Sequence, residues 1–324
     1  MKIQLITPAK KYSKNGNRTS ALRWAKFLRN QGHWVDIETQ YNGAACELLI
    51  ALHAKHAANA VNLYRSFYPQ GPLIVALGGT DVNTFLDTDR EITLNCMEQA
   101  DALVCLHSKI CDRLPSHLHS KLHFIRQSAM PLASARKPSK RNFDICMVGH
   151  LRTEKDPLRA AMALRLLPES SRIRLFHLGK AHDKKWAQAA SREQKENHRY
   201  NWLGEVPSWR VRREYIKTNL MVLTSTQEGG ANVLSEAIAA NVPIIASDIP
   251  GNTGLLGSDY PGLYKKCDEH HLANLLQQAE SDPVFLKCLE RACHMLRPKF
   301  LPDCESKKWN ELVKSVISQV QVCH

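Results

Sequence analysis

The stretch 220–257 constrains the fold more than any other part of the chain, because two strand-like runs flank a helix-like segment in it. The runs Leu220–Leu223 and 243–248 are short and apolar, which predicts buried strands. Between them, apolar residues recur at helical spacing from Ala231 to Ile238. This order predicts one strand–loop–helix–strand unit of a parallel sheet, and such units bind ligands at the carboxyl ends of their strands.

The polar loop 224–230 of this unit carries the first candidate site residues. Gly229 and Gly230 allow backbone N–H groups to approach an anion closely at a helix start, where the helix dipole favours negative charge. Glu228 lies in the loop, and Glu236 lies eight residues further on, inside the helix. We expect both carboxylates to lie near the carboxyl ends of the strands, where a ligand would bind. The alternative is a pair of acidic residues on a solvated helix face.

Strands and helices alternate along the rest of the chain, which predicts an α/β fold with two doubly wound, Rossmann-like parallel sheets. The strands expected in the first half are 2–8, 33–38, 47–52, 73–77, 102–106 and 123–126, with helices over 19–31 and 53–67. The strands expected in the second half are Phe143–Val148, 174–178, 201–203, Leu220–Leu223 and 243–248.

A chain of 324 residues is long enough for two domains. The segment 130–141 is rich in Pro, Ser and charge and shows no periodicity, which is typical of a linker. We therefore expect one domain over 1–135 and a second over 136–301. The tail 302–324 predicts a helix whose apolar stripe consists of Trp309, Leu312, Val313, Val316 and Ile317.

The net charge of the chain bears on which classes of partner it can bind. The formal charge is +13, with basic residues spread along the sequence and short clusters at 10–14 and 136–141. We interpret the excess as favouring small phosphorylated substrates. The competing hypothesis, a non-catalytic basic protein that binds nucleic acid, has only this charge behind it, because the sequence contains no nucleic-acid-binding module.

The sequence also indicates where the protein acts. No apolar run reaches the roughly 18–20 residues that span a bilayer, and the apolar run near the N-terminus is too short for a secretory signal. We expect a cytoplasmic protein that does not associate with membranes. The 10 cysteines form no C-x-x-C pair, so we expect neither a zinc site nor a disulfide framework.

A second candidate group follows the strand Phe143–Val148, where the sequence V-G-H-L-R-T-E-K-D-P places Gly149, Arg152 and Lys155 at a strand end. Two fixed cations there can neutralise the charge that develops on a departing diphosphate, a task that a metal ion performs in other enzymes. The strand ends at Gly179 and at Gly204-Glu205 are further candidates for contacts with a nucleotide.

The first half offers its own candidates at strand ends. The loop 10–20 contains Gly16, Asn17, Arg18 and Thr19, which form either an anion-binding seat or a solvated basic turn. We favour the seat because the loop is long and polar. The other candidates at the predicted carboxyl edge of this sheet are His53, Lys55, Thr80, Asp81, Gln127 and Ser128. For His53 the alternative is a satisfied core histidine.

The segment E-G-G-A-N-V-L-S-E resembles the E-x7-E motif of GT-B glycosyltransferases of the family-4-like group. The resemblance implies two Rossmann-like domains that face each other across a cleft, with the final helix crossing back to the first domain. It implies that Arg152, Lys155 and Glu228 are catalytic and that Glu236 binds the nucleotide ribose. The implied UDP-sugar site comprises Gly149, Arg152, Lys155, Gly179, Gly204, Glu205, Glu228, Gly229, Gly230, Ala231, Asn232, Val233 and Glu236.

A closer resemblance spans most of the chain. The segments G-N-R-T-S-A-L-R-W-A, A-L-H-A-K-H-A-A-N-A, I-R-Q-S-A-M-P-L and S-D-I-P-G-N-T-G-L-L-G together are similar to the selenosugar synthases of selenoneine biosynthesis. What this implies is transfer of a hexosyl unit from UDP-N-acetylglucosamine or UDP-glucose to selenophosphate, without a metal or another cofactor. The candidates of the first half would then bind the acceptor. The runner-up acceptor is another small thiol or a phosphorylated metabolite.

The acceptor side departs from the expected pattern at one position. Gly78-Gly79-Thr80 stands where the resemblance leads us to expect Thr-Gly-Thr. Selenophosphate carries a soft and already ionised nucleophile, so we expect it to need little help from a general base. The chemistry expected from the sequence is therefore positioning of the substrates together with stabilisation of the leaving group.

Overall fold

A computed structural model describes residues 1–13 and 16–322 of the chain. The chain forms two compact units, one made of Met1–Gln127 together with Pro302–His324 and the other of Ser128–Leu301. Lys14 and Asn15 of the expected anion-binding loop lie outside the described residues, as does Cys323.

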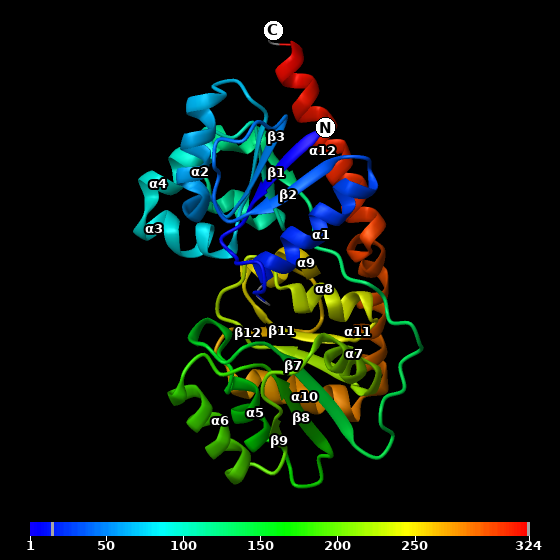
Figure 1. The fold of residues 1–324 in the computed structure, drawn as a ribbon. Helices are drawn as coiled ribbons and strands as arrows, with labels where there is room; N and C mark the ends of the chain where they lie inside the picture. The colour runs from blue at the N-terminus through cyan, green and yellow to red at the C-terminus, as the bar shows by residue number, and fades with distance from the viewer. Residues whose placement is uncertain (14–15, 323–324) are drawn as a thin grey trace. The chain divides into compact units, whose positions relative to one another are not determined.

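The first unit is built on a six-stranded sheet with the strand order β2-β1-β3-β4-β5-β6 (Figure 1). Its strands are β1 (Lys2–Ile6), β2 (Trp34–Glu38), β3 (Leu48–Leu52), β4 (Leu73–Ala76), β5 (Ala102–Cys105) and β6 (Leu122–Phe124). Neighbouring strands are parallel throughout. Every residue of β3 and β4 is buried, and such unbroken apolar runs are typical of a parallel sheet that is covered on both faces.

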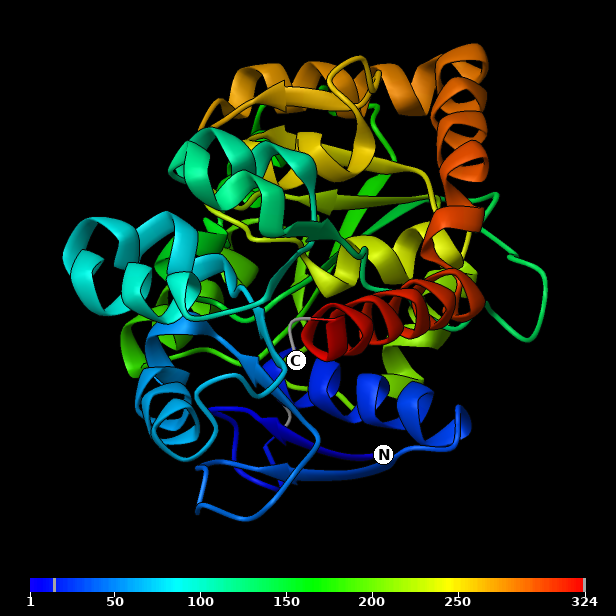
Figure 2. The same ribbon diagram turned by 90° about the horizontal axis from the view of Figure 1, so that it is seen from above.

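Helices cover both faces of this sheet. The helical segments are α1 (Gly16–Asn30), α2 (Ala54–Phe67), η1 (Asp81–Phe85), α3 (Leu86–Thr88), α4 (Arg90–Glu98), η2 (Ser108–Arg113), η3 (Ser116–Lys121) and α12 (Pro302–Val322). Side chains of α2 and α4 pack in one core, whereas α1 and α12 share the other. Figures 1 and 2 show α1 and α12 side by side on their face of the sheet.

The contact between α1 and α12 is made by buried aromatic and charged side chains. The indole of Trp309 is fully buried, and its ring centroid lies 4.8 Å from that of Trp24. Glu305, which is 1% exposed, accepts hydrogen bonds from Trp24 Nε1 at 2.7 Å and from Arg23 Nε at 2.8 Å. These contacts join the last helix of the chain to the first unit.

The second unit repeats the architecture with the strand order β12-β11-β10-β7-β8-β9. Its strands are β7 (Phe143–Val148), β8 (Ile173–Leu178), β9 (Tyr200–Trp202), β10 (Leu220–Leu223), β11 (Ile244–Asp248) and β12 (Leu263–Lys265). Its helical segments are η4 (Thr153–Lys155), α5 (Arg159–Arg165), α6 (Lys184–Glu196), α7 (Ser208–Lys217), α8 (Asn232–Ala239), α9 (Pro250–Leu256), α10 (Glu269–Ser281), α11 (Pro283–Leu296) and η5 (Arg297–Phe300). Because β8 follows β7 on one side and β10 lies on the other, the strand order reverses between β7 and β10.

The predicted α/β class and the repeated doubly wound parallel sheet are confirmed. Helix α9 and strand β12 are among the elements that the sequence does not predict. The segment Pro250–Leu256 contains two glycines and little apolar periodicity, which hides the helix. The strand Leu263–Lys265 is only 3 residues long, too short to produce a pattern.

The segment 130–141 is irregular, and polar contacts tie it to the second unit. Arg212 donates hydrogen bonds to the carbonyl oxygens of Met130 (3.0 Å) and Pro131 (2.6 Å). Arg136 donates to the carbonyl oxygens of Thr218 and Asn241, each at 2.7 Å. Accordingly the second unit begins at Ser128, before the expected linker.

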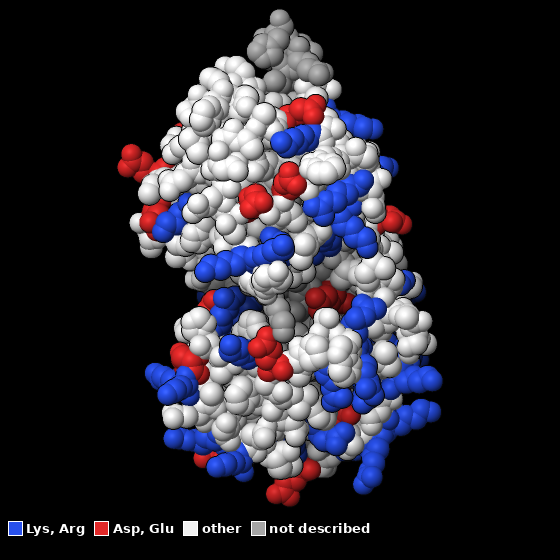
Figure 3. Space-filling model, in the orientation of Figure 1, with Lys and Arg blue, Asp and Glu red and all other residues white. Residues whose placement is uncertain are grey.

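Two properties of the surface bear on the expected partners. None of the described helices is both long and apolar enough to cross a membrane. Figure 3 shows Lys and Arg side chains spread over both units on the face in view, with Asp and Glu side chains between them.

Candidate functional site

A small hollow in the second unit lies where the strand order of the sheet reverses. Its lining comes from the carboxyl ends of β7, β8 and β10 and from the loops that follow β7 and β10: Met147, Val148, Gly149, His150, Lys155, Pro157, His177, Leu223, Thr224 and Ser225. Ligands of open parallel sheets bind at such a reversal, because the loops of the two strands diverge there. Gly149 borders open space, since a Cβ built on it would meet no atom within 4 Å.

The loop after β7 is held against the loop after β10 by backbone contacts. Thr226 N donates to Glu154 O at 2.9 Å, and Thr224 Oγ1 donates to Lys155 O at 2.8 Å. Asp156 has a φ of 43°, so the chain turns sharply before α5 begins. These contacts fix the position from which the side chain of Lys155 projects.

Lys155 and Glu228 form an ion pair at this site, between Lys155 Nζ and Glu228 Oε1. Ser225 Oγ donates a second hydrogen bond to the same carboxylate oxygen at 2.6 Å. The side chain of Lys155 is 18% exposed and that of Glu228 is 9% exposed, so water screens the pair only partly. The structure therefore brings together two of the three predicted catalytic residues.

Arg152, the third of them, has a different environment. Its Nε lies 3.0 Å from Glu154 Oε1, and its side chain is 45% exposed. The guanidinium carries five N–H groups, and this contact engages one of them. Arg152 thus lies at the open edge of the loop, with donors available to an anionic ligand.

The start of α8 provides backbone N–H groups beside Glu228. Ala231 precedes the helix without a side-chain cap, and Asn232 and Val233 form its first turn. Gly229 and Gly230 lead into this turn, and Gly230 has a φ of 126°, a conformation that favours glycine. Uncapped N–H groups at a helix start attract anions, so the anion site predicted for this loop has suitable donors and stays a prediction.

Helix α9 supports the loop from behind. A Cβ on Gly251 would lie 2.2 Å from Glu228 O, so only glycine permits this close approach. Asn252 Nδ2 donates to Ser247 O at 2.9 Å, and Ser247 Oγ donates to Ser225 O at 2.5 Å. The segment P-G-N-T-G-L-L therefore positions Glu228 through packing and hydrogen bonds.

Glu236 lies in the second turn of α8 and is half-buried. Tyr215 Oη donates a hydrogen bond to Glu236 Oε2 at 3.2 Å. Burial, together with the negative charge of Glu236, raises the pKa of Tyr215 well above its usual range. Tyr215 therefore stays protonated and orients the Glu236 carboxylate.

The remaining candidates of this half surround the end of β8. Gly179 N donates to Gly204 O at 2.8 Å, and Trp202 Nε1 donates to Gly179 O at 2.9 Å. Glu205 follows Gly204 and is exposed. These residues form a connected rim along β8 and β9.

In the first unit, four of the predicted acceptor residues lie together at the ends of β3 and β4. His53 Nδ1 is 2.7 Å from Asp81 Oδ1, and His53 Nε2 is 2.6 Å from Thr80 Oγ1. Lys55 Nζ forms an ion pair with Asp89 at 3.0 Å. His53 and Asp81 are buried, whereas Thr80 is exposed.

The other predicted residues of the first half lie at the start of α1 and after β6. Gly16, Asn17, Arg18 and Thr19 form the first turn of α1, in which Arg18 is 7% exposed. Gln127 Nε2 donates to Ser20 Oγ at 2.9 Å, which joins the end of β6 to α1. Ser128 is buried and is the first residue of the second unit.

Comparison with known proteins places this geometry in a family. The family described as glycosyl transferases group 1 matches residues 133–294, which is half of the chain. The chain belongs to this family. The matched residues include the β7 loop, the Lys155–Glu228 pair and α8.

Relatives of this glycosyltransferase are distant in sequence. Glycosyltransferase 1 domain-containing protein 1 of Xenopus tropicalis is 24% identical over an alignment of 267 positions, which covers 73% of this chain and 76% of the relative. HepE of Anabaena, solved in complex with UDP and with UDP-glucose, has a TM-score of 0.79 and 15% identity over 97% of this chain and 100% of that one. Sucrose-phosphate synthase of Thermosynechococcus elongatus has a TM-score of 0.78 and 16% identity over 98% of this chain and 99% of that one. These similarities confirm the GT-B fold class.

Sequence reasoning missed two buried histidines of this glycosyltransferase. His177 is 1% exposed and lines the hollow of the second unit, where its Nε2 donates to Gly149 O at 3.1 Å while its Nδ1 accepts from Tyr200 Oη at 2.9 Å. Burial lowers the pKa of His177 to about 4, so the ring is neutral at neutral pH. Its position inside the predicted strand 174–178 was the available signal.

His107, at the end of β5, is 3% exposed, and among the described residues neither of its ring nitrogens has a hydrogen-bond partner. Burial lowers its pKa to about 4, and the positive charge of Arg126 acts in the same direction. Arg126 Nε and Gln127 Oε1 also lack partners among the described residues. Buried polar atoms are rarely left unpaired, so this edge of the first sheet is suited to a polar ligand.

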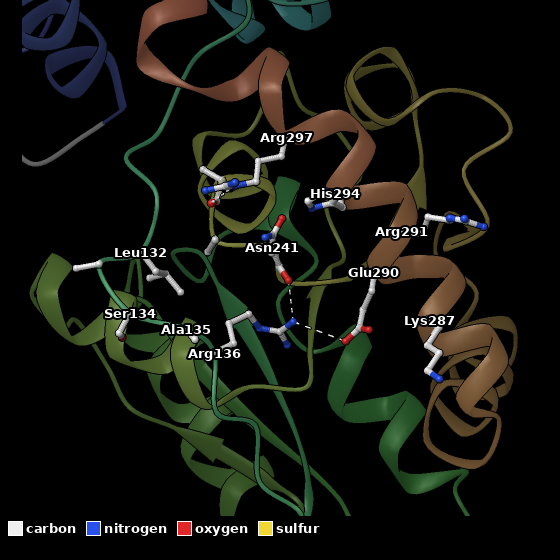
Figure 4. A pocket seen from close by; sticks show the side chains of 13 residues that line it. Leu132, Ser134, Ala135, Arg136, Asn241, Lys287, Glu290, Arg291, His294 and Arg297 are labelled. Atoms are coloured by element: carbon white, nitrogen blue, oxygen red, sulfur yellow. Dashed lines mark hydrogen bonds and ion pairs between the residues drawn. The ribbon is translucent and has the colours of Figure 1, made fainter.

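A larger cavity, of about 740 Å³, lies elsewhere in the second unit (Figure 4). It adjoins the carboxyl end of α8, the end opposite the site, and α11. In Figure 4 the guanidinium of Arg136 points toward Asn241 and Glu290, and Arg297 Nε donates to Ala239 O at 3.1 Å. These two arginines neutralise carbonyl groups at the end of a helix, which accounts for much of the basic lining. Among the described residues, no group of three or more His, Cys, Asp or Glu side chains is placed to hold a metal ion.

Proposed function

We propose that this group 1 glycosyltransferase transfers a hexosyl unit from UDP-N-acetylglucosamine or UDP-glucose to selenophosphate, forming a carbon–selenium bond. The observation that carries the donor half of the proposal is the Lys155–Glu228 pair beside the uncapped start of α8, at the reversal of strand order. The HepE structures, which contain UDP and UDP-glucose, support the choice of donor by their shared fold.

The donor would bind in the second unit with its diphosphate at the start of α8. Backbone N–H groups there, Lys155 and Arg152 supply donors and positive charge to the phosphates. Glu236, oriented by Tyr215, would accept hydrogen bonds from the ribose hydroxyls. The uracil would lie along the rim formed by Gly179 and Gly204.

The reaction breaks the bond between the anomeric carbon and the β-phosphate oxygen, and UDP leaves with the electron pair. Negative charge therefore accumulates on the β-phosphate, where fixed cations stabilise it more than they stabilise the bound donor. Lys155 already holds a partner, Glu228, and keeps two further N–H groups for the phosphate. Glu228 would then lie near the hexosyl group.

The acceptor would bind in the first unit. Selenophosphate is a small anion, and the edge of this sheet offers Arg18 and Arg126 together with the polar side chains of His107 and Gln127. A lone pair on selenium forms the new bond to the anomeric carbon. The observations that favour an anion here hold equally for a phosphorylated metabolite, which remains the second candidate acceptor.

Product analysis tests the proposal directly. The protein is incubated with each UDP-sugar and with selenophosphate, thiophosphate, inorganic phosphate, a small thiol or no acceptor, and the products are weighed by mass spectrometry. We expect UDP and a selenium-containing hexose to form together, and only with selenophosphate present. Transfer to another acceptor, with none to selenophosphate, would contradict the proposed acceptor and leave the proposed donor in place. No UDP release from either sugar with any acceptor would contradict the function.

A further inference from the structure

Three side chains at the ends of β3 and β4 form a chain of polar contacts from the protein interior to its surface. Asp81 is 0% exposed and lies 2.7 Å from His53 Nδ1, while His53 is 4% exposed and lies 2.6 Å from the hydroxyl of Thr80. Thr80 is exposed. An exposed hydroxyl, a buried imidazole and a buried carboxylate in this order are the elements of a proton relay.

The backbone holds the imidazole and carboxylate in place. Asp81 Oδ2 accepts N–H groups of Ala54 (2.8 Å) and Gly78 (2.7 Å), and its Oδ1 accepts that of Lys55 (3.0 Å). His53 has a φ of 81°, which is unusual for a residue with a side chain and marks a strained position.

The departure from the expected Thr-Gly-Thr pattern has its physical reason here. A Cβ on Gly78 would lie 2.6 Å from His53 Cδ2, so a larger residue would collide with the imidazole ring. Glycine at this position is what allows His53 to lie between Asp81 and Thr80.

The contacts also determine which ring nitrogen carries the proton. Asp81 Oδ1 lies 2.7 Å from Nδ1, and among the described residues Nδ1 has no partner with the geometry of a hydrogen bond. The negative charge of the carboxylate still repels a lone pair on Nδ1 and favours a proton there. Nε2 of the neutral ring then presents a lone pair, and Thr80 must donate its hydroxyl proton to it. The oxygen of Thr80 is left with its lone pairs for a ligand and therefore selects a ligand group that donates a hydrogen bond.

We infer that Thr80, His53 and Asp81 relay a proton away from the acceptor, which must present a proton at the point of contact with Thr80. This inference rests on the proposed function, and it departs from the expectation that selenophosphate needs little help from a general base, because the proton leaves a phosphate oxygen and not the selenium nucleophile. Hydrogen selenophosphate meets the requirement with a P–O–H group. As the Se–C bond forms and UDP leaves with the electron pair, that proton passes to Thr80 Oγ1, and the proton of Thr80 passes to His53 Nε2. The resulting imidazolium is stabilised by Asp81 and later loses its proton to water.

Other charged and titratable groups near His53, among the residues that the structure describes, lie on α2 and after α3. His56, on α2, has its ring centroid 4.4 Å away, and burial together with the charge of His53 lowers its pKa. Lys55 lies on the same helix and is paired with Asp89, which follows α3. His56 is therefore largely neutral at neutral pH, and Asp81 is the partner that stabilises a charged His53.

The test compares wild type with Thr80→Val, which keeps the shape of an exposed side chain and removes the hydroxyl, and with Thr80→Ser as matched control. With selenophosphate as acceptor, we expect Thr80→Val to lower kcat by about 10²-fold, as for loss of a general base, and Thr80→Ser to stay near wild type. Because a proton moves in this step, wild-type kcat should fall in heavy water, and this dependence should vanish in Thr80→Val. A Thr80→Val variant with wild-type kcat and the wild-type solvent isotope effect would overturn the relay and leave the transferase function standing.

Nitrogen NMR of the His53 ring gives a readout that does not depend on turnover. We expect the proton of the neutral ring on Nδ1 in the protein without substrate. A proton on Nε2 would overturn the relay, whether or not sugar transfer to selenophosphate is observed.

Discussion

Lys155 Nζ is paired with Glu228 Oε1, although the two residues belong to loops that follow different strands, β7 and β10. The pair spans the reversal in strand order, and both side chains are largely shielded from water. Two adjacent and opposite charges at the mouth of a parallel sheet suit a substrate that has an anionic diphosphate next to a neutral sugar. Lys155 would contact the diphosphate, and Glu228 would lie beside the sugar.

Loss of both cations tests the stabilisation of the leaving group. We predict that Arg152→Ala combined with Lys155→Ala lowers kcat by on the order of 10²–10³-fold, because each residue removes positive charge from the developing diphosphate. Steady-state release of UDP measures the effect. Lys287→Ala with Arg291→Ala, which removes two exposed cations from the other cavity, is the control. Equal losses in both double variants would indicate a general effect of net charge.

Removing the Glu236 carboxylate should weaken UDP binding through the ribose. We predict that wild type binds UDP more tightly than 2′,3′-dideoxy-UDP and that Glu236→Ala binds both alike, as measured by calorimetry. Tyr215→Phe, which removes only the 3.2 Å hydrogen bond to Glu236, should have a smaller effect. A preference for the ribose hydroxyls that persists in Glu236→Ala would assign them to another residue.

Two glycines of the site should respond oppositely to alanine. Gly251→Ala places a Cβ against Glu228 O, so we predict a lower melting temperature as well as weaker UDP binding. Gly149→Ala meets open space, so we predict an unchanged melting temperature and weaker UDP binding because the methyl group occupies the nucleotide position. Thermal unfolding and UDP titration of the two variants separate these effects, and a Gly149→Ala variant with normal UDP affinity would contradict the placement of the diphosphate.

His177 should make stability depend on pH. Its pKa is lowered from 6.5 to about 4 by burial, so the unfolded chain binds the proton more tightly and acid favours unfolding. The stability contributed by the neutral ring is complete above pH 6.5 and is lost as pH falls toward 4, by about 3 kcal/mol. The difference in unfolding free energy between wild type and His177→Gln should shrink by this amount from pH 7 to pH 4 in urea titrations. A difference that stays constant would contradict a neutral buried His177.

The contact of α12 with α1 should contribute strongly to the first unit. We predict that Trp309→Ala destabilises it by about 3–5 kcal/mol, because the cavity left by a fully buried indole cannot close. Lys307→Ala, on the exposed side of the same helix, should change stability little. Urea unfolding followed by Trp fluorescence and circular dichroism measures both, and similar effects of the two changes would contradict the packing.

The strands that carry long apolar runs could be predicted from the sequence within a residue or two. Leu48–Leu52, Phe143–Val148 and Leu220–Leu223 are buried on both faces, so their composition alone marks them. Helix α9 could not be predicted, because its stability comes from Gly251 and Asn252 packing against the Glu228 loop and hardly from helical periodicity. Local patterns report burial, and they fail where a segment is fixed by contacts distant in sequence.

The candidate site likewise contains residues that the sequence predicts and others that only contacts distant in sequence reveal. Lys155 and Glu228 were predicted from motifs in two separate loops, and the fold brings them into contact. The relay of Asp81, His53 and Thr80 was not foreseen as a unit, since it depends on the room left by Gly78 and on the positive φ of His53. His177 lies inside a predicted strand and His107 directly follows one, and only their burial distinguishes them.

The most direct measurement is a crystal structure of the protein with UDP. The account predicts the diphosphate at the start of α8, within hydrogen-bonding distance of Lys155, and the ribose hydroxyls on Glu236. UDP bound instead in the cavity lined by Arg136 and Arg297, with the Lys155–Glu228 pair untouched, would contradict it.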